Sequence, residues 1–397
     1  MKKHKALLFQ PYIRSFVTNF FKYSKYFEFI MEHKEETNNQ LYRKLNDFNK
    51  EIKRNKVTLL LKIRRIMGIP NVRFKFSNKE DLFFTYGCLV VGNKPYCVYS
   101  ETGLSIYNYD RKIANNFFAR LIVSFIIRRK NCKKIIFLSE AAQKSFFSSA
   151  RYSKKSLKIF KKKTTFCYPL LEPPKETSIK KAEKVIKFLF VGIFYMKGGI
   201  ELVNAFKKVK CAYPNIKLTI VSSLAVIKKE HINQINSIPE INLLDAKFSK
   251  EEMNELYDTH HIFIMPTYRD GFGLSWVEAL SHAMPIIGMK QFATEEFCIN
   301  DYNGFMFSDH PLQDYNPETF EIYGKYYNPI DFYTRLFQLQ KNGGLKKVEN
   351  FLYNSMEKIM LNPELVIKFS ENSLKHYTEN FHPDVIGKKF DSILLGT

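Results

Sequence analysis

Two carboxylates flank a glycine-rich turn in the stretch RDGFGLSWVEALSHAMPII, residues 269–287. Asp270 stands directly before the turn Gly271 to Gly273, and Glu278 follows it within an expected helix. Glycines let a ligand approach the backbone N–H groups closely, and the start of a helix attracts anions. An acid about one turn into the helix can accept hydrogen bonds from vicinal hydroxyls, as a ribose presents them. The stretch therefore predicts a site for an anionic, hydroxyl-rich ligand.

Both acids also have local explanations, and the residues alone leave these open. Asp270 is a common residue type at turns and helix N-caps. Glu278 can interact favourably with the start of its own helix.

A second loop of this kind occurs in FLFVGIFYMKGGIEL, residues 188–202. An apolar strand is expected to end at Gly192, a short loop carries Lys197, and Gly198 and Gly199 open a helix. A lysine beside a helix N-terminus suits a bound phosphate. The phosphate-loop pattern GxxxxGK[ST] is absent, so an ordinary strand–turn–helix with a surface lysine remains the alternative.

The elements that position these loops alternate between strands and helices in both halves of the chain, which favours parallel sheets with helical crossovers. In the first half the expected strands are residues 57–63, 72–76, 81–87, 95–100 and 133–139, and the expected helices are 112–130 and 140–150. In the second half the expected strands are 187–192, 216–223, 262–267 and 285–289, and the expected helices are 197–214, 250–260 and 275–283.

The aromatic segment at residues 15–31 has its large side chains at helical spacing, which predicts an amphipathic helix. Such a helix either packs on the domain or lies on a membrane. The basic run and the Pro173-Pro174 pair within residues 154–184 are the best candidate for a linker. Ligands of open α/β sheets bind at the carboxyl ends of the strands, which is where both glycine-rich loops fall.

Charge is distributed very unevenly along the 397 residues, whose net charge is +23. Residues 1–180 hold 38 Lys and Arg against 13 Asp and Glu, while the remainder holds 24 against 26. A basic first half suits an anionic partner such as a phospholipid surface or a polyanionic substrate. Solubility combined with lysine-rich codon usage is the alternative. Nucleic acid is disfavoured, because no recognition motif accompanies the lysines.

The chain has neither the cysteine spacing of a disulfide framework nor that of a zinc site, which favours a reducing compartment. No signal peptide is expected at the start. The most apolar run, residues 117–127, is too short to cross a bilayer and contains Arg120. We therefore expect a cytoplasmic protein, in contact at most with the inner face of the membrane.

The pattern Asp270-Gly-Phe-Gly-Leu-x-x-x-Glu278, followed by Ala279-Leu280 and Pro285-Ile286-Ile287, resembles the E-x7-E signature of family-4 retaining glycosyltransferases. The similarity runs over about residues 185–310, from Lys197-Gly198 to the turn beginning at Asp301. It implies a GT-B fold, in which two Rossmann-like domains face each other across a cleft. The expected domains are residues 1–172, completed by a C-terminal helix at about 382–397, and residues 173–381.

By this resemblance the second domain binds a nucleotide-sugar, with a UDP- or GDP-linked sugar as substrate and with no cofactor or metal. Lys197 would neutralise the diphosphate, Asp270 would meet the sugar, and Glu278 would bind the ribose; these three are the candidate catalytic residues. The other candidate donor-binding residues are Gly192, Gly198, Gly271, Phe272, Gly273 and Leu274.

The sequence departs from the family pattern at informative positions. Asp270 replaces the usual Glu, and Ile193 stands where an Arg often follows the strand glycine. Arg269 is a candidate to compensate for that missing charge. Across the cleft, Glu101 is a candidate to touch sugar or acceptor, although pairing with a nearby Lys or Arg is the more ordinary explanation for an acid in a loop. His282, after the signature, is expected to be packed rather than catalytic.

The expected function is that of a retaining, metal-independent hexosyl- or related glycosyltransferase. It would move a sugar from a nucleotide-sugar donor to a glycan or lipid-linked acceptor, in cell-surface polysaccharide or glycoconjugate biosynthesis. The alternatives are a GT-B nucleotide-sugar epimerase and a catalytically weak, donor-binding partner subunit.

Overall fold

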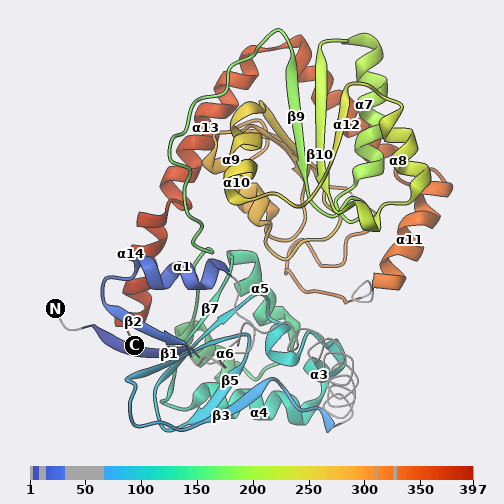
Figure 1. Ribbon diagram of the computed structural model, residues 1–397. Coiled ribbons are helices and arrows are strands. Elements are labelled where there is room, and N and C mark those ends of the chain that lie inside the picture. The colour runs from blue at the N-terminus through green and yellow to red at the C-terminus, as the bar shows by residue number, and fades with distance from the viewer. Residues whose placement is uncertain (1–2, 9–14, 32–66, 310, 325–328, 397) are drawn as a thin grey trace, which may run out of the picture. The chain divides into compact units, whose positions relative to one another are not determined.

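The computed structural model describes residues 3–8, 15–31, 67–309, 311–324 and 329–396 (Figure 1). The chain divides into two compact units. Unit 1 comprises residues up to Tyr168 together with Pro317–Gly324 and the chain from Gly387 onward. Unit 2 comprises Pro169–Asn316 and Lys325–Ile386.

Unit 1 is built on a six-stranded, all-parallel sheet with a small two-stranded parallel sheet beside it. The order in the large sheet is β2 (Phe27–Met31), β1 (His4–Leu8), β4 (Leu82–Tyr86), β6 (Tyr96–Ser100), β7 (Cys132–Phe137) and β8 (Thr164–Phe166). The small sheet pairs β3 (Val72–Lys75) with β5 (Leu89–Gly92). The helices are α1 (Ser15–Tyr23), α3 (Arg111–Asn115), α4 (Phe117–Arg128), α5 (Glu140–Ser149), α6 (Lys154–Lys163) and the later part of α14 (Pro383–Leu395).

The predicted helix over residues 15–31 is wrong beyond Tyr23. Helix α1 ends there, and the Ser24 side chain accepts a hydrogen bond from the Phe27 backbone N–H at 3.1 Å and donates one to Asp391 at 2.6 Å. This turn sends Phe27–Met31 into β2, which pairs with β1. The aromatic side chains fit a helical period and a strand period equally, so their spacing could not separate the two. Phe16 and Phe20 are buried, so α1 packs on its own unit.

Two further segments of unit 1 differ from expectation. The predicted helix 112–130 is two helices, because the Asn116 side chain caps α4 by accepting a hydrogen bond from the Ala119 N–H. The predicted linker 154–184 begins with α6, which Ser153 caps, and with strand β8. After this strand, residues 167–185 have no regular secondary structure. The predicted strand 57–63 lies outside the described residues, whereas the strands expected at 72–76, 81–87, 95–100 and 133–139 are present.

Unit 2 contains a second six-stranded parallel sheet, with β9 at its centre. The order is β11 (Ile241–Asp245), β10 (Ile216–Ser222), β9 (Ile186–Val191), β12 (Ile262–Met265), β13 (Ile286–Met289) and β14 (Gly304–Phe307). The helices are α7 (Gly199–Ala212), α8 (Lys229–Asn236), α9 (Lys250–Thr259), α10 (Leu274–Ser281), α11 (Pro329–Lys341), α12 (Lys346–Leu361) and α13 (Glu364–Asn380).

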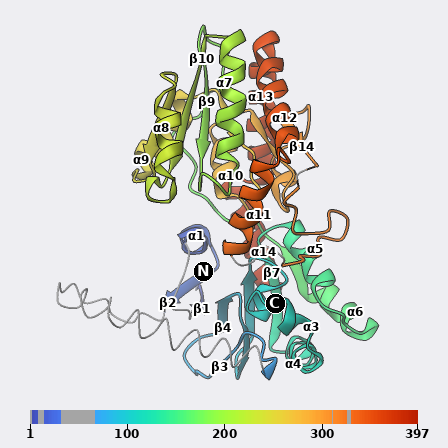
Figure 2. The same cartoon turned by 90° about the vertical axis from the view of Figure 1, so that its right-hand side faces the viewer.

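Helices cover both faces of this sheet. Helix α7 packs with α12 and α10 packs with α13, and Figure 1 shows the two pairs on opposite sides of the strands. Figure 2 shows α7 and α12 side by side along β9 and β10. Because both faces are covered, β12 is apolar along its length and β9 is apolar apart from Lys187, with Phe188, Leu189 and Phe263 fully buried. The predicted α/β class is therefore confirmed, with a Rossmann-like parallel sheet in each unit.

In the sheet of unit 2, the order in which the chain adds strands reverses between β9 and β12. From β9 the chain adds strands β10 and β11 on one side, and it then crosses back to add β12, β13 and β14 on the other. Ligands of such sheets bind outside the carboxyl ends of the strands at this switch point. The two glycine-rich loops both leave the sheet there.

Candidate functional site

The loop after β9 is held tightly against the loop after β12. Gly198 caps α7 with a left-handed backbone (φ 72°), and a Cβ at this position would lie 2.5 Å from the carbonyl oxygen of Pro266. The Tyr268 N–H also donates to the Met196 carbonyl at 3.0 Å. Only glycine combines this conformation with so close an approach, so Gly198 sets where α7 begins.

The loop after β12 ends in a second glycine N-cap. Gly273 has φ 101° at the start of α10, and a Cβ there would lie 2.9 Å from Cδ1 of Trp276. Gly271 has open space around it. The Phe272 side chain is buried edge-on against Phe297, with ring centroids 4.9 Å apart, so it anchors the turn in the core. The turn therefore presents backbone groups, rather than the Phe272 side chain, to a ligand.

An ion pair joins the two loops. The Lys197 Nζ donates to Asp270 Oδ2 at 2.5 Å and to the Arg269 carbonyl at 2.9 Å. The Lys197 and Asp270 side chains are only 13% and 16% exposed. Gly192 makes room for this arrangement, because a Cβ there would lie 2.8 Å from Cγ of Lys197. A largely buried cation and anion thus meet at the switch point of the sheet.

The starts of α7 and α10 add backbone donors at the same edge. The first turn of a helix carries N–H groups that have no partner within the helix, together with a partial positive charge. Helix α10 begins at Leu274, and α7 begins at Gly199, whose own N–H already donates to the Phe194 carbonyl at 2.8 Å. With Lys197 between the two loops, the arrangement is chemically suited to a multiply charged anion such as a diphosphate.

Glu278 lies on α10, and the Tyr257 hydroxyl of α9 donates to its Oε2 at 2.9 Å. Burial raises the pKa of the Glu278 carboxyl above its ordinary value. The structure thus brings Lys197 and Asp270 into direct contact, whereas Glu278 accepts a hydrogen bond from a tyrosine. Oriented by Tyr257, the carboxylate keeps further lone pairs for hydroxyl donors.

The remaining candidates fall in different surroundings. Arg269 contributes its carbonyl to Lys197, and its charge acts on the nearby Tyr333 hydroxyl. Glu101 belongs to unit 1, where the hydroxyls of Tyr86 and Tyr109 donate to its two oxygens, the latter at 2.7 Å. His282 is buried, pairs with Asp258 at 2.7 Å and stacks on the Tyr257 ring, as expected of a packed residue.

Sequence reasoning missed two side chains beside the site. Tyr257, which orients Glu278, lies in a segment whose sequence shows only an ordinary amphipathic helix pattern. Glu201, in the first turn of α7, looks like an acid placed for the helix dipole, yet it is buried and accepts a hydrogen bond from Gln340 at 3.0 Å. Burial raises the pKa of Glu201 to about 7. Glutamate is a polar residue, and nothing in the sequence indicated that Glu201 is buried.

The raised pKa of Glu201 leads to a prediction about the pH dependence of stability. Its pKa is raised on folding, so between the unfolded and folded values the native state binds the proton more tightly and the free energy of unfolding falls as pH rises. We expect Glu201→Gln to be more stable than the parent at pH 8 by on the order of 1–3 kcal/mol. The difference should vanish below about pH 4.5, where Glu201 is protonated in both states.

Urea unfolding followed by Trp276 measures this, because Trp276 is the only tryptophan of the chain and is fully buried in unit 2. Glu371→Gln, which replaces an exposed acid on α13, is the matched control. It should leave the urea midpoint unchanged both at pH 8 and below about pH 4.5. A stabilisation by Glu201→Gln that is the same at both pH values would contradict the assignment.

Comparison with a family model matches the part of the chain that contains this site. Residues 173–316 match the family model of the group 1 glycosyl transferases. A curated relative, an uncharacterized glycosyltransferase of Methanocaldococcus jannaschii, is 25% identical over 136 residues. That alignment spans 34% of this chain and 37% of the relative. The family match includes the loops that hold Lys197 and Asp270, but neither match covers the greater part of the chain.

Solved structures match the whole chain at low sequence identity. Anabaena HepE in complex with UDP is 12% identical, with a TM-score of 0.59 over 100% of both chains. Sucrose-phosphate synthase of Thermosynechococcus elongatus is 12% identical, with a TM-score of 0.57 over 99% of this chain and 98% of that one. These similarities establish the GT-B fold class predicted from the sequence, with two Rossmann-like domains.

Proposed function

We propose that this chain is a retaining, metal-independent glycosyltransferase that moves a hexosyl or related group from a nucleotide-sugar to a glycan or lipid-linked acceptor. The observation that carries the proposal is the contact between Lys197 and Asp270 at the switch point of unit 2, between two glycine-capped helix starts. The matches to group 1 glycosyl transferases and to HepE in complex with UDP support it.

In this proposal each part of the site contacts one part of the donor. Lys197 and the N–H groups at the start of α7 bind the diphosphate, and Asp270 binds the sugar. The backbone of the turn before α10 closes on the sugar and phosphate, and Glu278 binds the ribose hydroxyls. The proposed donor-binding residues are Gly192, Lys197, Gly198, Asp270, Gly271, Phe272, Gly273, Leu274 and Glu278.

The chemistry assigned to the site is stabilisation of a leaving group. The bond from the anomeric carbon to the phosphate oxygen breaks, the acceptor oxygen bonds to the same carbon on the same face, and the acceptor proton passes to the departing phosphate. Negative charge grows on the diphosphate during this step. A fixed lysine and oriented N–H groups stabilise that charge without reorganising, which is the usual source of large electrostatic rate effects.

The acceptor is proposed from the charge distribution. The excess of Lys and Arg in residues 1–180 suits a lipid-linked or anionic glycan presented at the inner face of a membrane. In the described part of the chain, no helix has the length and apolar character required to span a bilayer. We therefore propose peripheral contact, in the cytoplasm, during cell-surface polysaccharide or glycoconjugate synthesis.

A donor titration tests the proposal directly. Trp276 packs against Gly273, so its fluorescence should change when a nucleotide-sugar fills the site. We expect saturable binding of a UDP- or GDP-sugar at roughly 1 µM to 1 mM, and weaker binding of CMP-sugars. Transfer to acceptor should then survive EDTA, and nuclear magnetic resonance should show the anomeric configuration retained.

Other outcomes identify the alternatives. Conversion of the nucleotide-sugar without any acceptor would mark an epimerase. Binding with no turnover over a broad acceptor panel would mark a donor-binding partner subunit. Absence of binding by all three nucleotide-sugar classes would overturn the proposed function.

A further inference from the structure

Helix α4 of unit 1 exposes an unusually apolar face. The exposed side chains are Phe117 (59%), Phe118 (68%), Leu121 (51%), Ile122 (40%) and Phe125 (66%). These positions recur every three to four residues and therefore lie along one side of the helix. Ala119, Val123 and Ile127 form the opposite side and are fully buried. Helix α4 thus has two apolar faces, of which only one is covered by the described residues of its own unit.

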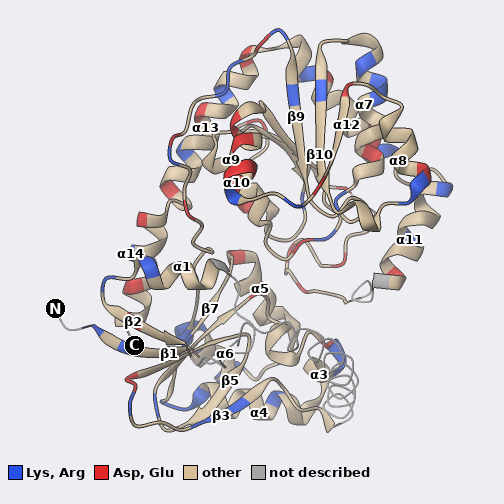
Figure 3. Cartoon of the chain, viewed as in Figure 1, with Lys and Arg blue, Asp and Glu red and all other residues tan. Residues whose placement is uncertain are grey.

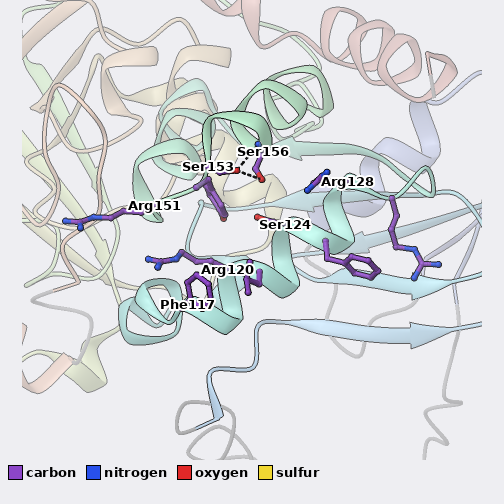
Figure 4. Close-up of a pocket in the computed structure, with 11 residues that line it drawn as sticks. Phe117, Arg120, Ser124, Arg128, Arg151, Ser153 and Ser156 are labelled. Atoms are coloured by element: carbon purple, nitrogen blue, oxygen red, sulfur yellow. Dashed lines mark hydrogen bonds between the residues drawn. The ribbon is translucent and has the colours of Figure 1, made fainter.

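A basic hollow adjoins this face. It has a volume of about 750 Å³ and lies where α4 meets the start of α6 (Figure 4). Four arginines line it, namely Arg120, Arg128, Arg129 and Arg151. No acid forms an ion pair with any of these four within the described ranges of the chain.

The start of α6 contributes further polar groups to the hollow. Ser153 caps the helix by accepting a hydrogen bond from the Ser156 N–H at 3.2 Å, and both serines line the hollow opposite Ser124 of α4 (Figure 4). The start of a helix favours an anion, and arginine forks match phosphate oxygens. The hollow therefore suits a phosphate group.

Positive charge continues along α6. Five of its lysines are exposed: Lys154, Lys155, Lys158, Lys161 and Lys162. Figure 3 shows the Lys and Arg positions of α4 and α6 on the ribbon. An apolar strip bordered by cations is the pattern of a helix that lies in a membrane interface, with apolar side chains at the acyl boundary and cations at the headgroups.

We propose that α4 is the membrane-docking surface of this protein and that the arginine hollow holds a phosphate of an anionic phospholipid. The apolar strip includes Leu121 and Ile122 beside the phenylalanines, which suits acyl chains better than the phosphates and stacked bases of nucleic acid. The assignment gives the proposed membrane contact a location. It rests on unit 1 alone, so it stands or fails independently of the donor chemistry of unit 2.

Vesicle sedimentation of the full chain tests this docking surface. We expect the protein to sediment with vesicles of phosphatidylcholine and phosphatidylglycerol at least about tenfold more strongly than with phosphatidylcholine alone. Phe118→Ser/Phe125→Ser should reduce this binding at least about tenfold, because it removes apolar contact. Arg128→Gln/Arg151→Gln should remove most of the preference for the anionic lipid.

Matched controls lie in unit 2. Ile330→Ser/Leu361→Ser removes two side chains that are 71% and 63% exposed, and Lys207→Gln/Lys368→Gln removes two exposed cations. Neither pair should alter vesicle binding. All variants should melt as the parent does and should bind nucleotide-sugar as the parent does, which separates a failed membrane assignment from a failed donor site.

Three results would overturn the docking surface. One is the absence of binding to anionic vesicles at low salt. Another is vesicle binding that the α4 variants leave unchanged. The third is self-association that Phe118→Ser/Phe125→Ser abolishes in sedimentation velocity without vesicles, since the apolar face would then join two copies of the chain.

Discussion

Replacing Lys197 by alanine is expected to slow sugar transfer by roughly two to three orders of magnitude, the usual effect of losing one preorganised group at a developing charge. The substitution removes the cation that lies between the two loops and leaves the 16%-exposed Asp270 carboxylate without its partner. Both changes disfavour a diphosphate at this point. Steady-state transfer with saturating acceptor measures the loss.

A second measurement on the same variant separates these two effects. If Lys197 acts on the diphosphate, Lys197→Ala should also weaken the binding of UDP or GDP alone, which carries no sugar for Asp270 to contact. If Lys197 serves only to neutralise Asp270, binding of the sugar-free nucleoside diphosphate should be unchanged, and the proposed role of the lysine would be wrong. Lys207→Ala, which replaces an exposed lysine on the following helix α7, should transfer at the parental rate.

Replacing Glu278 by alanine is expected to weaken donor binding by about tenfold to a hundredfold, because a ribose hydroxyl would lose its charged acceptor. The chemical signature is more specific than the loss itself. The parent should bind a donor with 2′-deoxyribose more weakly than the ribose form, and Glu278→Ala should bind both alike. Calorimetric titration of the four combinations gives the coupling between Glu278 and the hydroxyl.

The pH dependence offers an independent readout for Glu278. Burial raises the pKa of this carboxyl, so it takes up a proton at a higher pH than an ordinary glutamate. Only the ionised form is a pure acceptor, so donor affinity should fall as pH decreases through that pKa. Glu278→Gln should lack this dependence, and Glu255→Ala, an exposed acid on α9, should keep it. Equal affinity of Glu278→Ala and the parent for the donor at every pH would refute the ribose contact.

The elements around the site were predictable because their signals are local. Strands β9, β12 and β13 are buried on both faces and read as short apolar runs between turn residues. The glycines at 198 and 273 mark the helix starts for a steric reason that sequence alone suggests. Lys197 and Asp270 follow two strands whose pairing in a parallel sheet brings their ends together.

What sequence could not supply depends on partners distant in the chain. Strand β2 exists because Ser24 turns the backbone and bonds to Asp391, near the other end of the chain. Glu201 is buried where Gln340 donates a hydrogen bond to one of its oxygens, and nothing near Glu201 in the sequence indicates this. The apolar run 117–127 could be excluded as a membrane span, but which of its side chains are covered depends on how unit 1 packs.

Trp276 has a consequence for how relatives of this chain can diverge. Its indole occupies the space beside Gly288 of β13, where any Cβ would overlap the ring. A relative with a side chain at position 288 must therefore carry a smaller residue at 276, or α10 would move away from the sheet together with the turn before it. The two positions should change together during evolution, as pairs in direct contact do. A glycine twelve residues beyond the tryptophan thus constrains the geometry of the turn Gly271 to Gly273 before α10.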